Sequence, residues 1–409
     1  MTTRTKTPIA VPQETCRLCG ARYGAARLEF GDLPPCNRFL ERLQELPRHP
    51  LTMAACENCG LLQLFYAMRP EMVAPRVPWI RYNEPSTHVG SLTDRLLEHM
   101  RRPPKTAVGV GPFEGPLQEE LRRRDIIVDT VQLCCPPTDG AFPYLETWQA
   151  KLSRGAFSGG RAGGAKADIV TCRYLLEHCH SPLEALRALG ELAAADGLVV
   201  VEAPDSAKFL ASGDYAFPWE EHICYFTEET LASLCRQAGF AVVEMLRFCG
   251  DLEDSLVAVL RRSDACSAPC FELNLSLFTF YRDRFESRRQ EVRRTLSGLA
   301  AGGRDHVALF GAGHQAIMFA NALAVAPLIK YVVDDDPNKV GTFPPGFSSR
   351  IRPSTQLFDD PRIRACLIGV SPRAEPKVRS LLQPLSARGV RLCSIFAGVL
   401  DSIFSGECG

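Results

Sequence analysis

Short apolar runs alternate with amphipathic stretches over most of this chain, and this alternation constrains the fold more than any other feature. Between Thr106 and Leu260 the apolar runs are TAVGVG, IIVDTV, ADIVTC, GLVVVEAP and AVVEML, separated by helical patterns such as PLQEELRRR, SPLEALRALGELAAA and TEETLASLCRQAG. A second set, HVALFGAG, IKYVVDDD, ACLIGVS and RLCSIF, follows near Val307. Strands that alternate with helices form parallel sheets covered on both faces. The sequence therefore predicts two α/β units.

The length of the chain allows two to three domains. Its 409 residues exceed the ~150 residues of a typical domain. We expect a cysteine-containing module over 1–75, an α/β domain over 76–270, a polar helical linker over 271–300 and a second α/β domain over 301–409. The Gly-rich stretch RGAFSGGRAGGAKAD in the first α/β domain predicts a surface loop.

The composition argues against several classes of protein. The chain has 47 basic and 47 acidic side chains, whereas a general nucleic-acid binder needs a basic excess. No apolar run approaches the ~20 residues of a membrane span, and the N-terminus lacks the apolar core of a signal peptide. We therefore expect a cytoplasmic protein without a nucleic-acid or membrane partner.

Two Cys-x-x-Cys pairs, Cys16 with Cys19 and Cys56 with Cys59, stand near the N-terminus. Each pair presents two thiolates on one side of a tight turn, and two such turns can enclose a tetrahedral zinc ion. Because four protein ligands leave no open position, this zinc would be structural. The alternatives are chance pairs or redox dithiols. Cys36 is not part of either pair, and we expect it to be structural.

The segment TAVGVGPFEGPLQEEL predicts a strand, a glycine-rich turn and the start of a helix. Gly109, Gly111 and Gly115 would let a ligand approach the backbone at the helix N-terminus. A ribose-binding acid is expected at the end of the next strand, but Gln132 stands there and Asp129 is three residues early. The loop therefore fits a nucleoside-cofactor site or a plain tight turn.

The segment HVALFGAGHQAIMFANAL predicts a second glycine turn, with Gly311 and Gly313. Asp334 follows 21 residues after Gly313, which is the spacing of a dinucleotide fingerprint, although Ala316 replaces its third glycine. Taken alone, this turn favours NAD binding by an oxidoreductase, but no hydride-transfer constellation accompanies it. A purely structural turn is the alternative.

The run YAFPWEEHICYFTEET places Glu220, Glu221 and His222 among aromatic residues. Trp219 and Tyr225 supply apolar bulk on either side, and pockets of this mixed kind shift pKa values and bind ligands. A histidine is suited to proton removal near neutral pH. The alternative is a polar elbow between a loop and a helix.

The four-cysteine array, PWEEHICYFTEETL and VVDDDPNKVGTFPPG together resemble the zinc-containing sugar C-methyltransferases. This family acts on nucleotide-linked 3-keto-deoxysugars in antibiotic biosynthesis and uses S-adenosylmethionine. The resemblance covers essentially the whole chain. It implies a class I methyltransferase (Rossmann-like) domain and a C-terminal Rossmann-like domain that helps to close over the nucleotide-sugar.

The resemblance also implies roles for individual residues. His222 would remove a proton beside a ketone, Glu221 or Glu220 would orient it, and His178 in RYLLEHCHSPLEAL would donate to the enolate oxygen. Tyr82 is the nearest substitute for a family tyrosine. Further residues would contact the substrate, by enclosing the sugar or by binding its diphosphate at a helix start: Trp219, Glu220, Tyr225, Gly311, Gly313, His314, Gln315 and Asp334.

Three positions depart from the family pattern. Gly109 stands where the family has an acid, Gln132 where it has the ribose-binding acid, and Trp219 where it has a tyrosine. Two further hypotheses therefore stay open. The chain could be a relative that catalyses a different reaction or only binds a partner, or it could be an NAD-dependent oxidoreductase.

Overall fold

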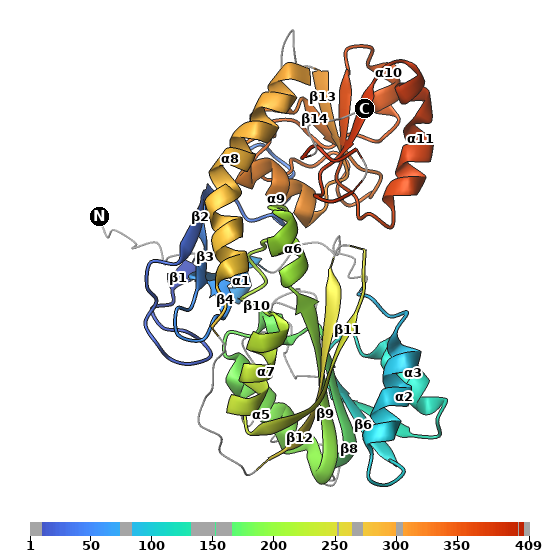
Figure 1. Cartoon of the computed structure of the whole chain (residues 1–409). Coiled ribbons are helices and arrows are strands. Elements are labelled where there is room, and N and C mark those ends of the chain that lie inside the picture. The colour runs from blue at the N-terminus through green and yellow to red at the C-terminus, as the bar shows by residue number, and fades with distance from the viewer. Residues whose placement is uncertain are drawn as a thin grey trace, which may run out of the picture.

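The computed structural model describes residues 10–73, 84–131, 152, 166–251, 253–263, 273–299, 306–399 and 401–404. Figure 1 shows the two α/β units as separate lobes, with the N-terminal module and the long helix α8 (Ser276–Leu299) beside them. None of the helices in these ranges is long and apolar enough to cross a membrane.

The N-terminal module is built from antiparallel strands. Its elements are β1 (Ala10–Pro12), β2 (Arg27–Leu33), β3 (His49–Ala55), β4 (Leu62–Leu64), β5 (Tyr66–Met68) and the short α1 (Pro70–Val73). Strand β1 pairs with β5, and a four-stranded sheet has the order β10-β4-β3-β2. Strand β10 (Cys224–Tyr225) belongs to the first α/β unit in sequence, so the module shares a sheet with its neighbour.

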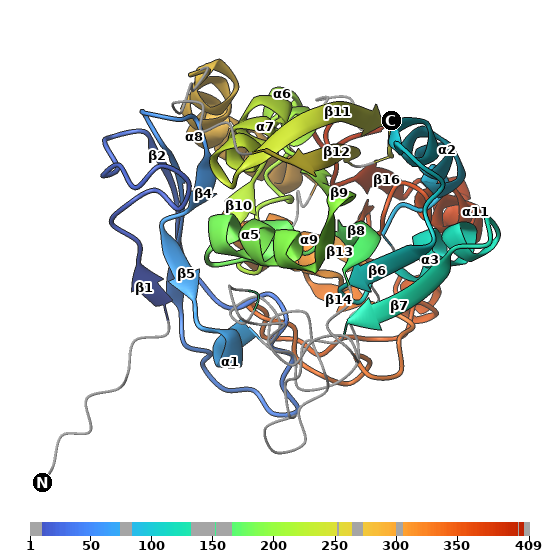
Figure 2. The ribbon, with the colours of Figure 1, turned by 90° about the horizontal axis from the view of Figure 1, so that it is seen from below.

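The first α/β unit contains a six-stranded sheet of order β11-β12-β9-β8-β6-β7. Its strands are β6 (Thr106–Val110), β7 (Ile127–Val131), β8 (Ala167–Arg173), β9 (Ala193–Asp205), β11 (Phe240–Phe248) and β12 (Asp254–Arg262). Its helices are α2 (Val89–His99), α3 (Gly115–Arg122), the single turn η1 (Leu176–His178), α5 (Pro182–Leu192), α6 (Ala207–Ser212) and α7 (Glu228–Gln237). Helices α2 and α3 cover one face of the sheet, and α5 and α7 cover the other (Figures 1 and 2).

This sheet is mixed, whereas the sequence predicted a parallel one. Strands β6, β7, β8 and β9 are parallel, but β12 runs antiparallel to both β9 and β11. Strand β12 was not predicted from the sequence. Only a short connection joins β11 to β12, and a short connection can join only antiparallel neighbours.

The second α/β unit confirms the predicted parallel arrangement. Its sheet has the order β14-β13-β15-β16, and every neighbouring pair is parallel. The strands are β13 (Val307–Phe310), β14 (Tyr331–Val333), β15 (Ala365–Ile368) and β16 (Arg391–Ser394). The helices are α9 (His314–Ala322), η3 (Ala326–Leu328), α10 (Gln356–Asp359) and α11 (Glu375–Ala387).

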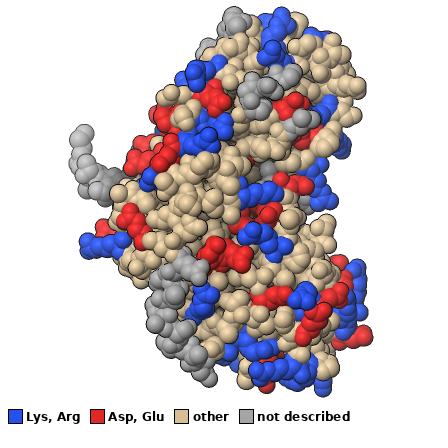
Figure 3. All heavy atoms as spheres, viewed as in Figure 1, with Lys and Arg blue, Asp and Glu red and all other residues tan. Residues whose placement is uncertain are grey.

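Charged side chains of both signs are intermixed on the face shown in Figure 3. No broad surface of one sign is visible on that face. This distribution agrees with the balanced charge of the sequence.

Candidate active site

Four cysteine thiols meet in the N-terminal module. Cys16 Sγ lies 3.5 Å from Cys59 Sγ, and Cys19 Sγ lies 3.5 Å from Cys56 Sγ. All four sulfur atoms lie within 4.8 Å of one another. Thiolates held at about 2.3 Å from a tetrahedral zinc ion are separated by about 3.8 Å. The quartet therefore fits one structural zinc ion, as the spacing predicted.

Cys36 stands outside this quartet and contacts the loop that carries His222. The backbone N–H of Cys36 donates to Glu220 Oε1, and Asn37 Nδ2 donates to Glu221 Oε1 at 3.1 Å. Both carboxylates are fully buried. Glu220 and Glu221 thus connect the N-terminal module by hydrogen bonds to the 213–223 loop. This loop joins α6 to β10.

His178 and His222 meet at the centre of the candidate site. Their ring centroids are 4.6 Å apart and their planes are nearly perpendicular, at 89°. His178 Nδ1 lies 3.0 Å from the backbone carbonyl oxygen of Glu221. Since a carbonyl only accepts, Nδ1 carries the hydrogen, and Nε2 of the neutral ring has a lone pair.

Both histidine rings are neutral near pH 7, so each has one ring nitrogen that can accept a proton. Burial lowers the pKa of His222 to about 4 and holds the pKa of His178 well below its usual range. A neutral His178 with its hydrogen on Nδ1 has no N–H at Nε2. The enolate-donor role that the family resemblance implies for His178 needs a hydrogen on Nε2, and it stays a prediction.

Glu221 contacts Asn37 and His178, and its predicted role of orienting His222 stays a prediction. Its carboxylate accepts from Asn37, and its backbone carbonyl accepts from His178. Burial is the cause of the lowered pKa of His222, whereas a carboxylate acting on that ring would raise the pKa. Glu221 therefore positions His178 through the backbone.

Trp219 joins the 213–223 loop to the second α/β unit. Its ring stacks on His314, the first residue of α9, with centroids 4.0 Å apart and planes at 14°. The Tyr225 hydroxyl accepts from the Trp219 backbone N–H at 2.9 Å and donates to the Trp219 carbonyl oxygen at 3.1 Å. Tyr225 therefore holds the loop in its folded form, and the stack brings both units to one site.

Side chains that follow β6 fill the space that an acid at position 109 would need. Gly111 has a φ of 121°, in the region that favours glycine. A Cβ atom on Gly109 would lie 2.3 Å from Gln118 Nε2 and 2.9 Å from Glu114 Cβ. Glu114 and Gln118 thus occupy the room that an acid at 109 would need. At Gly115, the first residue of α3, an added Cβ would meet nothing within 4 Å.

A buried charged network that was not predicted from the sequence lies at the carboxyl ends of β6, β8 and β9. Arg173 Nε donates to Glu202 Oε2 at 2.5 Å, and its Nη1 donates to the Phe113 carbonyl at 3.0 Å. His88 Nε2 lies 2.8 Å from Glu202 Oε1. Glu114 Oε1 accepts from the Arg173 backbone N–H at 2.7 Å. The sequence feature that could have predicted this network is a charged residue at the end of each apolar run.

This network lies where an open α/β sheet binds its ligand. The neighbours of β6 are β7 on one side and β8 on the other, so the sheet has its switch point there. Burial raises the pKa of Glu84 and of Glu114 to about 7, and that of Glu253 to about 8. S-adenosylmethionine carries two positive groups, a sulfonium and an ammonium. The glycine turn and this group of carboxylates fit such a ligand.

A pocket opens at the carboxyl end of the second sheet. Four of the predicted substrate-contacting residues and two lysines line it: Gly311, Gly313, His314, Asp334, Lys339 and Lys377. Asp334 Oδ2 accepts from the Ala312 backbone N–H at 2.7 Å, so this carboxylate supports the glycine turn. Gln315, the second residue of α9, is not part of the lining.

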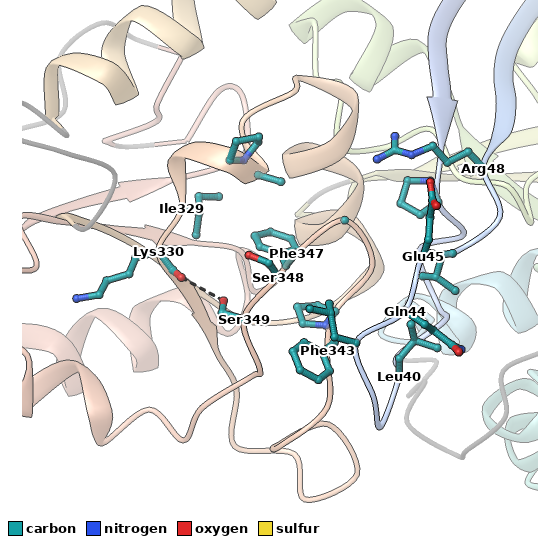
Figure 4. A pocket seen from close by; sticks show the side chains of 17 residues that line it. Leu40, Gln44, Glu45, Arg48, Ile329, Lys330, Phe343, Phe347, Ser348 and Ser349 are labelled. Atoms are coloured by element: carbon teal, nitrogen blue, oxygen red, sulfur yellow. Dashed lines mark hydrogen bonds between the residues drawn. The ribbon is translucent and has the colours of Figure 1, made fainter.

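A separate pocket lies between the N-terminal module and the second α/β unit (Figure 4). Leu40 and Arg48 face it from the module, and Phe343 and Phe347 face it from the other side. Backbone hydrogen bonds in both directions between Leu40 and Phe343, at 3.0 and 2.7 Å, close its edge. No predicted site residue lines this pocket.

Several predicted positions lie outside the described residues. They include Tyr82, Gln132 and most of the Gly-rich stretch. Their predicted roles in catalysis, cofactor binding and specificity stay predictions.

Three family models match successive parts of the chain. A zinc binding domain matches residues 16–73, a methyltransferase domain matches 87–245, and the C-methyltransferase C-terminal domain matches 271–368. The chain belongs to the zinc-containing C-methyltransferases. This domain order agrees with the cysteine quartet and the two α/β units of the structure.

Known proteins similar to this C-methyltransferase are distant. C-methyltransferase NovU of Streptomyces niveus is 22% identical over 360 residues, which cover 78% of this chain and 83% of NovU. A Burkholderia thailandensis 1,6-didemethyltoxoflavin-N1-methyltransferase, solved with S-adenosylhomocysteine, is 21% identical, with a TM-score of 0.32 and coverage of 44% and 80%. The glycopeptide N-methyltransferase MtfA, complexed with S-adenosylmethionine, is 9% identical, with a TM-score of 0.31 and coverage of 44% and 95%.

Proposed function

We propose that this C-methyltransferase transfers a methyl group from S-adenosylmethionine to a carbon atom beside the ketone of a nucleotide-linked deoxysugar or a related ketone. The observation that carries the proposal is the contact between two neutral histidines, the buried His178 and the partly buried His222, beside the Trp219–His314 stack. Proton removal next to a ketone needs a neutral base, and both rings have the required state at pH 7.

His222 is the residue that we assign to proton removal. Breaking the C–H bond leaves the electron pair in an enolate, which then forms the new C–C bond. Bound S-adenosylmethionine would supply the methyl group as an electrophilic sulfonium. His178 is held by the Glu221 carbonyl and would share the base function with His222, since its Nε2 accepts rather than donates.

We assign the nucleotide part of the substrate to the pocket of the second α/β unit. Lys339 and Lys377 line this pocket together with three acids, Asp334, Asp335 and Asp336, so the lysines give no excess of positive charge. The anion site that we assign there is the N-terminus of α9, which begins at His314. A diphosphate bound at this helix start would place its sugar toward Trp219, because the indole stacks on His314.

A non-methylating relative is favoured by one specific observation. Gln118 and Glu114 fill the space beside Gly109, so the family acid is absent and its place is closed. Such a protein would form the enolate and use it in another reaction, with no methyl transfer. The NAD-dependent alternative predicts NADH binding at the second glycine turn, which a fluorescence titration would detect.

The decisive experiment separates proton removal from methyl transfer. In deuterated water we expect the protein to exchange the α-proton of a nucleotide-linked keto-sugar, and to add one methyl group when S-adenosylmethionine is present. His222→Gln should lower the exchange rate by at least ~100-fold, whereas His180→Gln should not. Exchange without methylation would favour the non-methylating relative, and the absence of both across a panel of ketones would refute the proposal.

A further inference from the structure

The side chain of Gln63 lies between the cysteine quartet and the strand pair that supports the candidate site. Gln63 belongs to β4, is fully buried and pairs with Cys224 of β10. Its Nε2 lies 3.2 Å from Cys16 Sγ. Its Oε1 accepts from the backbone N–H of Arg17 at 3.1 Å and from Arg17 Nη1 at 3.2 Å. Both ends of this amide therefore have partners in the turn that carries Cys16 and Cys19.

The two donors from Arg17 fix the orientation of the Gln63 amide. The amide oxygen only accepts hydrogen bonds and the amide NH2 group only donates them, so Oε1 faces Arg17 and Nε2 faces the sulfur atom of Cys16. The backbone N–H of Leu18 donates to the same sulfur at 3.4 Å. Cys16 Sγ therefore accepts two N–H···S hydrogen bonds, which suits the thiolate form that binds a metal ion.

These contacts matter because the quartet with a zinc ion carries excess negative charge. Four thiolates outweigh the two positive charges of Zn²⁺, and Cys16, Cys56 and Cys59 are buried. Buried charge is costly unless hydrogen bonds and opposite charge compensate it. Gln63 supplies a hydrogen bond to one thiolate, and Arg17 supplies a guanidinium in the same turn. Loss of a partner that hydrogen-bonds to a metal ligand typically weakens metal binding by ~10–100-fold.

Arg17 and β4 extend this contact to the end of the 213–223 loop. Arg17 Nη1 donates to the backbone carbonyl oxygen of Leu64 at 2.9 Å. The backbone N–H of Leu64 donates to the carbonyl oxygen of Ile223 at 2.9 Å. Ile223 follows His222 directly in the chain. The Cys16 sulfur, the amide, the guanidinium and the strand backbone thus form a continuous series of hydrogen bonds that ends one residue from His222.

We propose that Gln63 and Arg17 are positioning residues through which a zinc ion in the quartet fixes the place of His222. Gln63 stabilises the Cys16 thiolate and orients the Arg17 side chain. Arg17 in turn holds the backbone of Leu64 against Ile223. The zinc ion would act through these hydrogen bonds and not on the substrate, in agreement with its four protein ligands.

Gln63→Glu separates the two ends of the amide in the full-length protein. A carboxylate can still accept from Arg17, but it has no N–H for the thiolate and adds negative charge beside it. We expect zinc binding to weaken by ~10–100-fold in competition with a chelator. With cobalt in the quartet, the sulfur-to-cobalt charge-transfer band should shift to longer wavelength, because a thiolate without its hydrogen bond gives up electrons more readily.

Gln13→Glu is the matched control for this substitution. Gln13 lies in the same module, but its Nε2 donates to the carbonyl oxygen of Thr15 at 3.0 Å and not to a sulfur atom. Zinc affinity and the cobalt spectrum should therefore stay unchanged in Gln13→Glu. Gln63→Met, which is similar in volume and uncharged, provides the same test if the buried carboxylate of Gln63→Glu prevents folding.

Arg17→Met tests the step from the zinc turn to the 213–223 loop, with zinc at saturating concentration. The Leu64 amide hydrogen should exchange with solvent ~10-fold faster, because the strand loses a charge-assisted hydrogen bond. The kcat of α-proton exchange should fall by ~10–100-fold with little change in KM, because His222 loses its exact position. Arg17→Lys, which can still donate to the Leu64 carbonyl, should restore most of both.

The effect of these residues on zinc and on β4 does not depend on the proposed function, whereas their effect on proton removal rests on it. Unchanged zinc affinity and an unchanged cobalt spectrum in Gln63→Glu would overturn the role of Gln63. Unchanged exchange of the Leu64 amide in zinc-loaded Arg17→Met would overturn the role of Arg17. An unsubstituted protein that removes no α-proton from any ketone would refute only the proposed function, since the metal and amide measurements need no substrate.

Discussion

At the scale of single residues, Gly109 is a position at which neighbouring side chains fill the space of an expected motif residue. The family resemblance led us to expect an acid here. The structure fills that space with Gln118, whose Nε2 donates to Thr130 Oγ1 at 2.9 Å, and with Glu114, which accepts from the Thr171 hydroxyl. Restoring the acid therefore conflicts with neighbours that already have partners.

We expect Gly109→Asp to destabilise the protein rather than to improve cofactor binding. The new Cβ would lie 2.3 Å from Gln118 Nε2 and 2.9 Å from Glu114 Cβ, and overpacking of this kind costs about 1–3 kcal/mol. Urea unfolding measures the loss. Gly115→Ala is the matched control, because its Cβ would meet nothing within 4 Å. Equal stability of Gly109→Asp and the unsubstituted protein would show that this loop adapts freely.

Only part of the candidate site could be predicted from the sequence. The Cys-x-x-Cys pairs were sufficient to predict the quartet, because their spacing is local and specific. The meeting of His178 with His222 depends on contacts between residues 44 positions apart, and the tautomer of His178 depends on the Glu221 carbonyl. No local pattern contains such information.

At the scale of elements, apolar runs predicted the strands well and their directions less well. The run ADIVTC corresponds to β8, and the helical pattern TEETLASLCRQAG corresponds to α7. Strand β12 was missed, and with it the antiparallel edge of the first sheet. Strand β10 also could not be predicted, because it is two residues long and pairs with β4 of the distant N-terminal module.

The pairing of β10 with β4 gives the zinc ion an indirect influence on the active site. Cys224 pairs with Gln63 and Tyr225 with Leu62, so the strand after the Cys56–Cys59 turn supports the end of the 213–223 loop. We expect Cys56→Ser to release the zinc, to loosen β4 and to lower activity, while both α/β units stay folded. Elemental analysis and hydrogen exchange of the β4 amides measure these effects.

Cys36→Ser is the control for the loss of zinc. Cys36 is buried beside Glu220 and stands outside the quartet, so this variant should keep its metal. Zinc retained by Cys56→Ser and lost by Cys36→Ser would mean that the ligand set is wrong.

At the scale of the whole molecule, the candidate site is assembled from all three parts of the chain. The N-terminal module binds Glu220 and Glu221, the first α/β unit supplies the histidines, and the second unit supplies His314. A double-mutant cycle of Trp219→Ala and His314→Ala should reveal a coupling of about 0.5–1.5 kcal/mol in the free energy of unfolding. Strictly additive effects would mean that the stack does not couple the two units.

The buried carboxylates predict how the stability of the whole molecule depends on pH. Burial raises the pKa of Glu84 and Glu114 to about 7 and that of Glu253 to about 8, from an ordinary value of 4.5. The folded state therefore binds more protons than the unfolded state between about pH 4.5 and 8, and the stability that these groups contribute is lost as the pH rises over this range. His222 acts in the opposite direction, because its lowered pKa removes stability as the pH falls from 6.5 toward 4.

From these four groups we therefore expect the free energy of unfolding to fall on the alkaline side of about pH 4.5 and to level off above about pH 8, because three carboxylates lose stability over this range and only His222 gains it, up to about pH 6.5. Saturating S-adenosylmethionine should reduce the loss on the alkaline side, because positive groups held beside Glu84 and Glu114 favour their ionised forms. Urea unfolding at a series of pH values, with and without the cofactor, measures both effects. Glu114→Gln should flatten the alkaline side in the absence of cofactor. A free energy of unfolding that rises steadily up to pH 8.5 would contradict this prediction. It would show that these carboxylates are already ionised and paired in the folded protein, so that no unpaired negative charge is left to bind the cationic cofactor.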